Sequence, residues 1–203
     1  MNSQSSQSAL NNTLENDPAY AHKPGSERDK DVPTLISLFN STFEDFNTRL
    51  VLGDDEPIYI PAGEKNKSYH QIVFAHGFFS SALHEIAHWC IAGEKRRLLE
   101  DYGYWYCPDG RDAAQQADFE KVEIKPQAIE WAFTEAAGRR FQVSTDNLNG
   151  AEPDREGFTK NVAAQLALYK ADGFPPRAER FINALENTFC KKKHDDAPGA
   201  DAA

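Results

Sequence analysis

The run His84-Glu85-Ile86-Ala87-His88 places two histidines four residues apart. On a helix, residues at this spacing are offset by about 40° around the axis and about 6 Å along it, so both imidazoles can reach one ion. Neutral imidazole is a good ligand for zinc, iron, nickel and copper. The neighbouring residues are largely apolar, and two polar rings in such surroundings would be costly without a partner. We therefore expect His84 and His88 to bind a divalent metal ion.

The full pattern H-E-x-x-H is typical of zinc peptidases, in which the glutamate is the general base and a third ligand follows. One peptidase class continues as H-E-x-x-H-x-x-G-x-x-H, but here Ile91 occupies the glycine position and Glu94 the position of the third histidine. Another class takes a downstream glutamate from an E-x-x-x-D helix, and no E-x-x-x-D follows His88. The peptidase interpretation therefore lacks its usual completion.

A second completion is two histidines and one carboxylate with open positions, the ligand set of non-heme Fe(II) oxygenases. Glu123 is attractive because Pro126 predicts a helix start just after it, and a carboxylate at a helix entrance can be held firmly. An ordinary surface glutamate would look the same, so the residues alone leave the third ligand open. The candidate carboxylates are Glu94, Asp109, Asp112, Glu120, Glu123 and Glu130.

The elements that must position these residues follow from the hydrophobic pattern. The histidine pair is expected on a helix over residues 79–92, and Gly93 stands where a helix C-terminal glycine is common. His76 lies on the turn before this helix, where it could support the site, contact substrate, or simply end a strand. Strands are expected at 49–52, 57–60, 71–75 and 104–106, with a further candidate at 141–144. Helices are expected within 33–46 and at 79–92, 112–122, 126–137, 153–171 and 175–189, an order that predicts an α+β fold.

The bulk composition is that of a globular protein: 203 residues, 40% of them hydrophobic and 27% charged. The polar ends, residues 1–31 and 191–203, are predicted to be disordered, which leaves one folded domain at 32–190. We expect a cytoplasmic protein with no membrane contact, because no apolar run approaches the roughly 20 residues that span a bilayer and no signal peptide is evident. The net charge of −10 argues against direct nucleic-acid binding. The three cysteines form no C-x-x-C pair, which disfavours a thiolate zinc site.

Six stretches of the sequence carry a family likeness. They are FNTRL at 46–50, GDDEPIY at 53–59, FAHG at 74–77, HEIAHWCIAG at 84–93, YGYWYCPDGR at 102–111 and VEIKPQA at 122–128. Together they resemble the bacterial elongation factor P hydroxylases, over about residues 35–189. The resemblance implies a single α+β domain in which a small sheet and further helices surround a central metal-binding helix, a fold similar to that of a metal-dependent ribonuclease family.

The resemblance also implies a reaction, the hydroxylation of the elongation factor P lysine that already carries a β-lysyl group. It implies Fe(II) as the metal and O₂ as the oxidant, with His84 and His88 as ligands. Glu123 is then the expected carboxylate ligand, because it lies within a family-like stretch. Glu85 would support the site or relay a proton instead of acting as a peptidase base, and His76 would assist beside it. Since an ammonium is attracted to ring faces and carboxylates, the candidates for binding the cationic substrate are Tyr104, Tyr106, Asp109 and Asp112.

Two other interpretations fit the same residues. The first is a zinc-dependent hydrolase, a peptidase or ribonuclease, that uses the H-E-x-x-H helix. The second is a non-catalytic adaptor that binds a translation factor and holds a structural metal. Metal analysis separates the first from an iron oxygenase, and a phenotype that survives loss of the metal would favour the second.

Overall fold

A three-stranded sheet lies along one side of the fold in the computed structural model, which describes residues 29–54, 56–101, 110–147, 150 and 152–190. Its strands are β1 (Thr48–Leu52), β2 (Ile58–Ile60) and β3 (His70–Phe74), in the order β1-β3-β2. β1 runs parallel to β3, and β2 runs antiparallel to it. The strands predicted at 49–52, 57–60 and 71–75 are confirmed with shifts of about one residue. The strand predicted at 104–106 lies outside the described residues.

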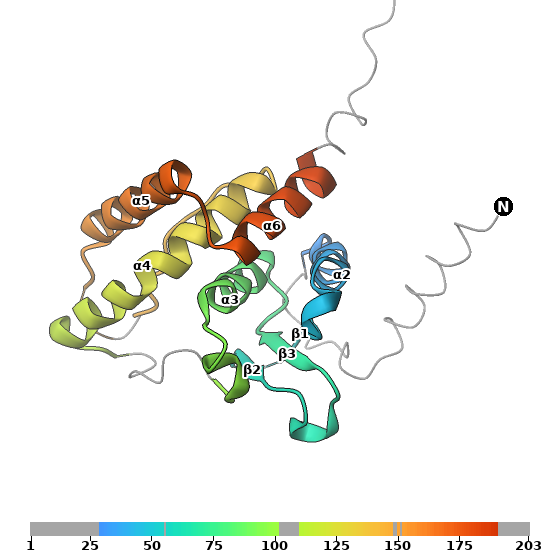
Figure 1. The fold of residues 1–203 in the computed structure, drawn as a ribbon. Helices are drawn as coiled ribbons and strands as arrows, with labels where there is room; N and C mark the ends of the chain where they lie inside the picture. The colour runs from blue at the N-terminus through green and yellow to red at the C-terminus, as the bar shows by residue number, and fades with distance from the viewer. Residues whose placement is uncertain (1–28, 55, 102–109, 148–149, 151, 191–203) are drawn as a thin grey trace, which may run out of the picture.

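The helices are α2 (Val32–Thr42), α3 (Phe79–Ile91), α4 (Ala113–Ala136), α5 (Arg155–Asp172) and α6 (Pro176–Leu185). Short 3-10 turns occur at Glu44–Phe46, Glu64–Asn66 and Arg96–Leu98, and a π-helical turn, Glu186–Cys190, follows α6. Figure 1 shows α3 between the sheet and α4, and both neighbours contact it. A segregated sheet with helices beyond it is the α+β arrangement that the sequence predicts. The likeness to a metal-dependent ribonuclease fold stays a prediction.

The hydrophobic core is built around α3. Its apolar side chains pack with those of α2, α6 and the sheet, and the Trp89 ring meets Phe43 at a centroid distance of 4.8 Å and Phe39 at 5.4 Å. The C-terminal end of α3 is held by Arg177, which donates to the carbonyl oxygens of Trp89, Cys90 and Ala92 at 2.6–3.0 Å. These carbonyls have no partner within the helix, so the guanidinium satisfies them. The helix expected to bind metal is therefore fixed along its length.

The prediction of two helices at 112–122 and 126–137 is wrong, because α4 is one continuous helix with Pro126 inside it. A proline in a helix interior removes one backbone hydrogen bond and costs about 3 kcal/mol. Here Pro126 is buried, and α4 packs against both α3 and α5. Burial on both sides outweighs the local cost of the proline. The helix begins at Ala113, and the side chain of Asp112, its N-cap, accepts from the backbone N–H of Gln115 at 2.9 Å.

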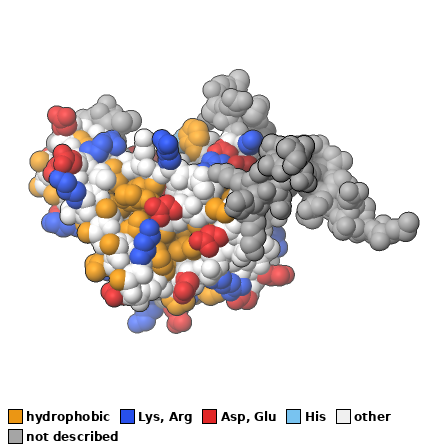
Figure 2. All heavy atoms as spheres, turned by 90° about the horizontal axis from the view of Figure 1, so that it is seen from above, with side chains coloured by type: hydrophobic (Ala, Val, Ile, Leu, Met, Phe, Trp, Pro, Cys, Tyr) orange, Lys and Arg blue, Asp and Glu red, His pale blue; other side chains and the backbone are white. Residues whose placement is uncertain are grey.

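The strand proposed at 141–144 does not form. The backbone of this segment bonds to side chains instead, with Ser144 paired to Gln127 and the Val143 carbonyl accepting from Arg155. The predicted disordered ends, 1–31 and 191–203, lie outside the described residues except for residues 29–31, where Asp29 and Asp31 pair with Arg139. Among the described residues, no helix is both long enough and apolar enough to cross a membrane. Figure 2 shows acidic and basic side chains interspersed on the face seen there, with hydrophobic side chains between them.

Candidate metal centre

Helix α3 presents the two histidines on a single face. Its residues Leu83, Ile86 and Ala87 are buried in the core, which turns the remaining face toward α4. His84 and His88 lie on that face and are partly buried, and their Nε2 atoms are 3.0 Å apart. This is the geometry expected for residues at positions i and i+4.

Helix α4 supplies the carboxylate. Glu123 is only 2% exposed, with Oε1 at 3.3 Å from Nε2 of His88 and Oε2 at 3.6 Å from Nε2 of His84. The expectation that Glu123 lies at a helix entrance is wrong, because the residue lies in the middle of α4. Its position is set by the packing of α4 on α3. A carboxylate in mid-helix is held by the helix on both sides, so the site does not depend on a helix terminus.

The spacing of the three groups suits a metal ion. Their ligand atoms all lie within 4.8 Å of one another. A metal about 2.1 Å from each ligand sets neighbouring ligand atoms about 3.0 Å apart at 90° and about 3.4 Å apart at 109°. The two imidazole nitrogens are 3.0 Å apart, and the two oxygens of Glu123 lie 3.3 Å from His88 and 3.6 Å from His84, which is close to these values. A metal ion bound by two imidazoles and one carboxylate on one side keeps its other coordination positions open.

A second carboxylate orients the first histidine. Oε2 of Glu130 lies 2.9 Å from Nδ1 of His84, on the opposite side of the imidazole from Nε2. A proton on Nδ1 is donated to Glu130, which leaves Nε2 as the nitrogen that faces Glu123 and His88 and that a metal can bind in place of a proton. Glu130 is 7% exposed, which protects this bond from water. This pattern, a histidine ligand held from behind by a carboxylate, recurs in metal sites.

Gln127 ties Glu123 to the segment that follows α4. Its side-chain amide donates to the Ser144 carbonyl at 2.7 Å and to Oε2 of Glu123 at 3.5 Å. Its oxygen accepts from the Ser144 backbone N–H at 3.0 Å. The 1% exposed Arg111 holds the next residues of the same segment, donating to the carbonyls of Thr145 and Asp146. The wall beside the carboxylate is therefore fixed by buried side-chain bonds.

The charges of the site stabilise one another. Burial lowers the pKa of His84, but the hydrogen bond to Glu130 and the charges of Glu123 and Glu130 outweigh it and raise that pKa to about 10. Burial raises the pKa of Glu123, but the charge and hydrogen bond of His88, with the charge of His84, lower it to about 2. Burial raises the pKa of Glu85, whereas the two histidines lower it by a smaller amount. The carboxylates thus stabilise positive charge between α3 and α4. A metal cation can supply that charge in place of the protons on the histidines.

A cavity of about 410 Å³ opens onto the three groups. It is also lined by Glu85, His76, Phe119 and Asp146. His76 is exposed, has a left-handed backbone with φ of 63°, and lies 6.2 Å from the Phe78 ring. A bulky residue seldom adopts this conformation, and here it places His76 at the wall of the cavity. Glu85 and His76 are thus beside the site, as the sequence predicts, and their roles stay predictions.

The remaining predicted residues divide into two groups. Asp112 caps α4 and lines neither this cavity nor the one described below, and its predicted contact with substrate stays untested. The other substrate candidates lie outside the described residues: Tyr104, Tyr106 and Asp109. Sequence reasoning named Glu130 as a candidate ligand but missed that it orients His84, and it missed Gln127. The available signal was the spacing of Glu123, Gln127 and Glu130 at i, i+4 and i+7, which puts all three on one helical face.

Comparison with known proteins decides the family. The family model of elongation factor P hydroxylase matches residues 38–197. The chain belongs to the elongation factor P hydroxylase family. The elongation factor P lysine hydroxylase of Haemophilus influenzae is 55% identical over 152 residues, which cover 74% of this chain and 85% of that protein. All three groups of the candidate metal centre lie inside the matched region of the hydroxylase family.

Proposed function

We propose that this protein hydroxylates a lysine side chain of elongation factor P at a metal held by His84, His88 and Glu123. The observation that carries the proposal is the convergence of two imidazoles and one buried carboxylate on one point beside an open cavity. Membership of the hydroxylase family supports the substrate. We further propose Fe(II) as the metal, O₂ as the oxidant and the β-lysyl-modified lysine as the substrate. The ligand set suits non-heme iron, although zinc binds the same atoms readily.

A bound Fe(II) ion with open positions would supply the activation of O₂. The residues of this chain have separate tasks around it. Glu130 keeps His84 in one tautomer and one orientation. Gln127 and Arg111 keep the cavity wall in place. The cavity positions a carbon of the substrate close to the centre, which removes the entropic cost of bringing the reactants together.

The overall reaction requires a reductant as well as O₂. A C–H bond is replaced by C–OH, one oxygen atom of O₂ enters the product, and the other leaves as water with two electrons and two protons. An external two-electron reductant must therefore reach the enzyme. Glu85 and His76 both line the cavity beside the metal centre, where a proton could be passed to or from the site, and this is the role that we propose for them.

The test uses anaerobically purified protein loaded with Fe(II) or with Zn(II). Each form is incubated with elongation factor P, O₂ and ascorbate as the reductant, and the factor is then weighed by mass spectrometry. We expect the iron form to add the mass of one oxygen atom and the zinc form to add nothing. The His88→Ala variant is the matched control, since it removes one ligand and keeps the rest of α3. Oxygen-independent hydrolysis by the zinc form, with no oxidation by the iron form, would replace the proposal with the hydrolase interpretation.

A further inference from the structure

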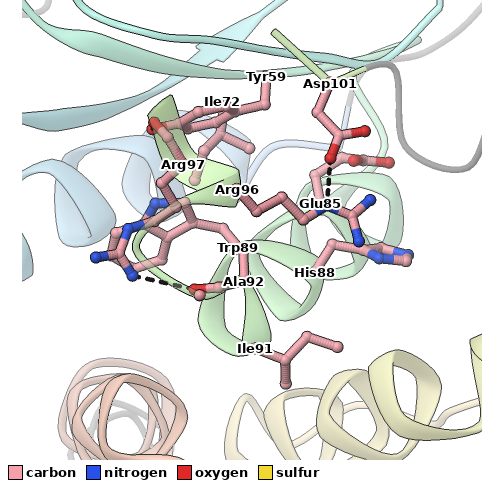
Figure 3. A pocket seen from close by; sticks show the side chains of 11 residues that line it. Tyr59, Ile72, Glu85, His88, Trp89, Ile91, Ala92, Arg96, Arg97 and Asp101 are labelled. Carbon is pink, nitrogen blue, oxygen red and sulfur yellow. Dashed lines mark hydrogen bonds and ion pairs between the residues drawn. The ribbon is translucent and has the colours of Figure 1, made fainter. Parts of the chain in front are cut away.

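A second cavity adjoins the metal centre and shares a wall with the first. It has a volume of about 260 Å³, and Glu85 and His88 line both cavities. Figure 3 shows these two side chains at one end, near Asp101, and the side chains of Tyr59, Ile72 and Trp89 farther along. The second cavity thus has carboxylates next to the metal centre, and beyond them it has the side chains of Tyr59, Ile72 and Trp89 together with the Arg97 guanidinium. A ligand that occupies both ends needs a charged group and a hydrocarbon part.

Two polar groups of this cavity have no hydrogen-bond partner among the described residues: the buried Nε1 of Trp89 and the carboxylate of Glu85. The Glu85 carboxylate also makes no ion pair with any other residue that the structure describes. It is partly buried between the two cavities, and burial of a carboxylate without a partner is unfavourable. A cationic donor from a ligand would relieve that cost. The position therefore fits a group that carries N–H donors and positive charge.

The arginines that line the cavity already have partners elsewhere. Arg96 donates through Nε to the carboxylate of Asp101. Arg97 donates from Nη1 to the Ala92 carbonyl at 3.1 Å, and its guanidinium lies 5.9 Å from the Phe46 ring. Asp101 and Arg96 thus balance each other, and Arg97 is engaged at the end of α3. Arg97 keeps its positive charge, because a carbonyl oxygen does not neutralise it, so the two arginines and the two carboxylates of the cavity balance in formal charge. Glu85 is the carboxylate of this cavity that has no hydrogen-bond donor among the described residues, and an ammonium group would supply one.

We propose that this cavity receives the amine-bearing end of the substrate lysine and that Glu85 binds its ammonium group. The inference rests on the proposed function and specifies how the substrate is recognised. In the β-lysyl-modified lysine the ε-nitrogen is an amide, so the ammonium groups belong to the β-lysyl group at the end of the side chain. The hydrocarbon stems match the apolar side chains of the cavity, and an ammonium group matches the Glu85 carboxylate. Since Glu85 follows His84 directly on α3, an ammonium at Glu85 holds the carbons of the same side chain close to the metal ligands. Glu85 then determines specificity for an amine substrate.

The experiment measures binding without turnover. Zinc-loaded protein is titrated by calorimetry with elongation factor P from cells that lack this enzyme, and with the same factor carrying Met in place of the lysine that wild-type enzyme hydroxylates. Loss of one charge-assisted hydrogen bond costs about tenfold to a hundredfold in affinity, so wild-type protein should prefer the lysine form by that factor. Glu85→Gln should reduce the preference to about threefold or less and keep zinc occupancy, whereas Glu85→Asp should keep part of it. Glu94→Gln makes the same charge change at an exposed position and should keep the full preference.

A second variant tests the cavity without changing its charge. A Cβ atom at Gly93 meets no heavy atom within 4 Å, and Gly93 lies on the lining of the cavity, so Gly93→Leu should fold normally and narrow the cavity from its rim. We expect it to weaken binding of the lysine form about tenfold or more, with zinc occupancy unchanged. Full preference for the lysine form in Glu85→Gln, or unchanged binding by Gly93→Leu, would overturn this inference. The proposed function would still stand in that case if the wild-type enzyme hydroxylates the factor. If wild-type protein neither binds nor hydroxylates the factor, the proposed function fails and this inference fails with it.

Discussion

The contact between Glu130 and His84 makes a quantitative prediction about metal affinity. Glu130→Ala removes the acceptor that holds the imidazole from behind, at 2.9 Å from Nδ1. Without it, the Nδ1 proton loses its partner in a largely buried place, and the ring is free to change orientation and tautomer. We therefore expect the affinity for metal to fall even though Glu130 is not a ligand.

The magnitude follows from the type of bond. A separation of 2.9 Å is within the range of charge-assisted hydrogen bonds, which are worth about 1.5–3 kcal/mol. Removal of a residue that orients a metal ligand typically lowers metal affinity about 10–100-fold. That ratio corresponds to about 1.4–2.7 kcal/mol, so the two estimates agree. Glu130→Gln keeps an acceptor oxygen and loses only the charge, and we expect a smaller effect, closer to tenfold.

The assay is an anaerobic competition titration of Fe(II), or of Co(II) followed by its absorption, against a chelator of known affinity. Glu135→Gln is the matched control, because Glu135 lies on the same helix and pairs with Trp131 and Lys170, away from the histidines. Thermal unfolding of the metal-free variants shows whether the helix is intact. Wild-type affinity in Glu130→Ala, with the helix folded, would refute the argument that Glu130 orients His84.

Three further predictions concern the framework of the site. Gln127→Ala leaves the backbone groups of Ser144 unpaired and should lower stability by about 1–3 kcal/mol in urea unfolding, together with a weaker metal titration. Arg177→Ala should cost about 2–3 kcal/mol in the same assay, because the carbonyls of Trp89 and Cys90 lose their donor and that of Ala92 keeps only Arg97, whereas the exposed Arg180→Ala should cost less than about 1 kcal/mol. Burial raises the pKa of the Cys90 thiol well above its ordinary value, so a variant with serines in place of the other two cysteines should react with a thiol reagent only after unfolding. Because the unfolded thiol ionises near pH 9 and the folded one does not, this variant should lose stability as the pH rises above about 9.

The histidine pair could be predicted from sequence because its geometry is local. Residues four apart on a helix share a face whatever the helix packs against. The strands, the first helix and α3 were predicted for the same reason, since hydrophobic periodicity reports which face of each element is buried. Residue spacing alone left six carboxylates as candidates for the third ligand. The family-like stretches favoured Glu123 among them. That choice names the same residue that the structure brings beside the histidines.

The features that could not be predicted depend on how α4 packs against α3. Pro126 argued for a break in the helix, and only the burial of both halves explains why the helix continues. The functions of Gln127 and Glu130 follow from the rotation of α4 about its own axis, which local sequence does not determine. Likewise, the segment at 141–144 has an alternating pattern, but the Gln127 amide and Arg155 take the backbone groups that a strand would pair.

The most direct test of the central claim is the mass of elongation factor P taken from cells. The factor is purified from cells that lack this protein and from the same cells supplied with the wild-type or the Glu123→Ala form. The account predicts the added mass of one oxygen atom on the modified lysine with the wild-type form only. An oxidised factor in cells that carry Glu123→Ala, or an unoxidised factor in cells that carry the wild-type form, would contradict it.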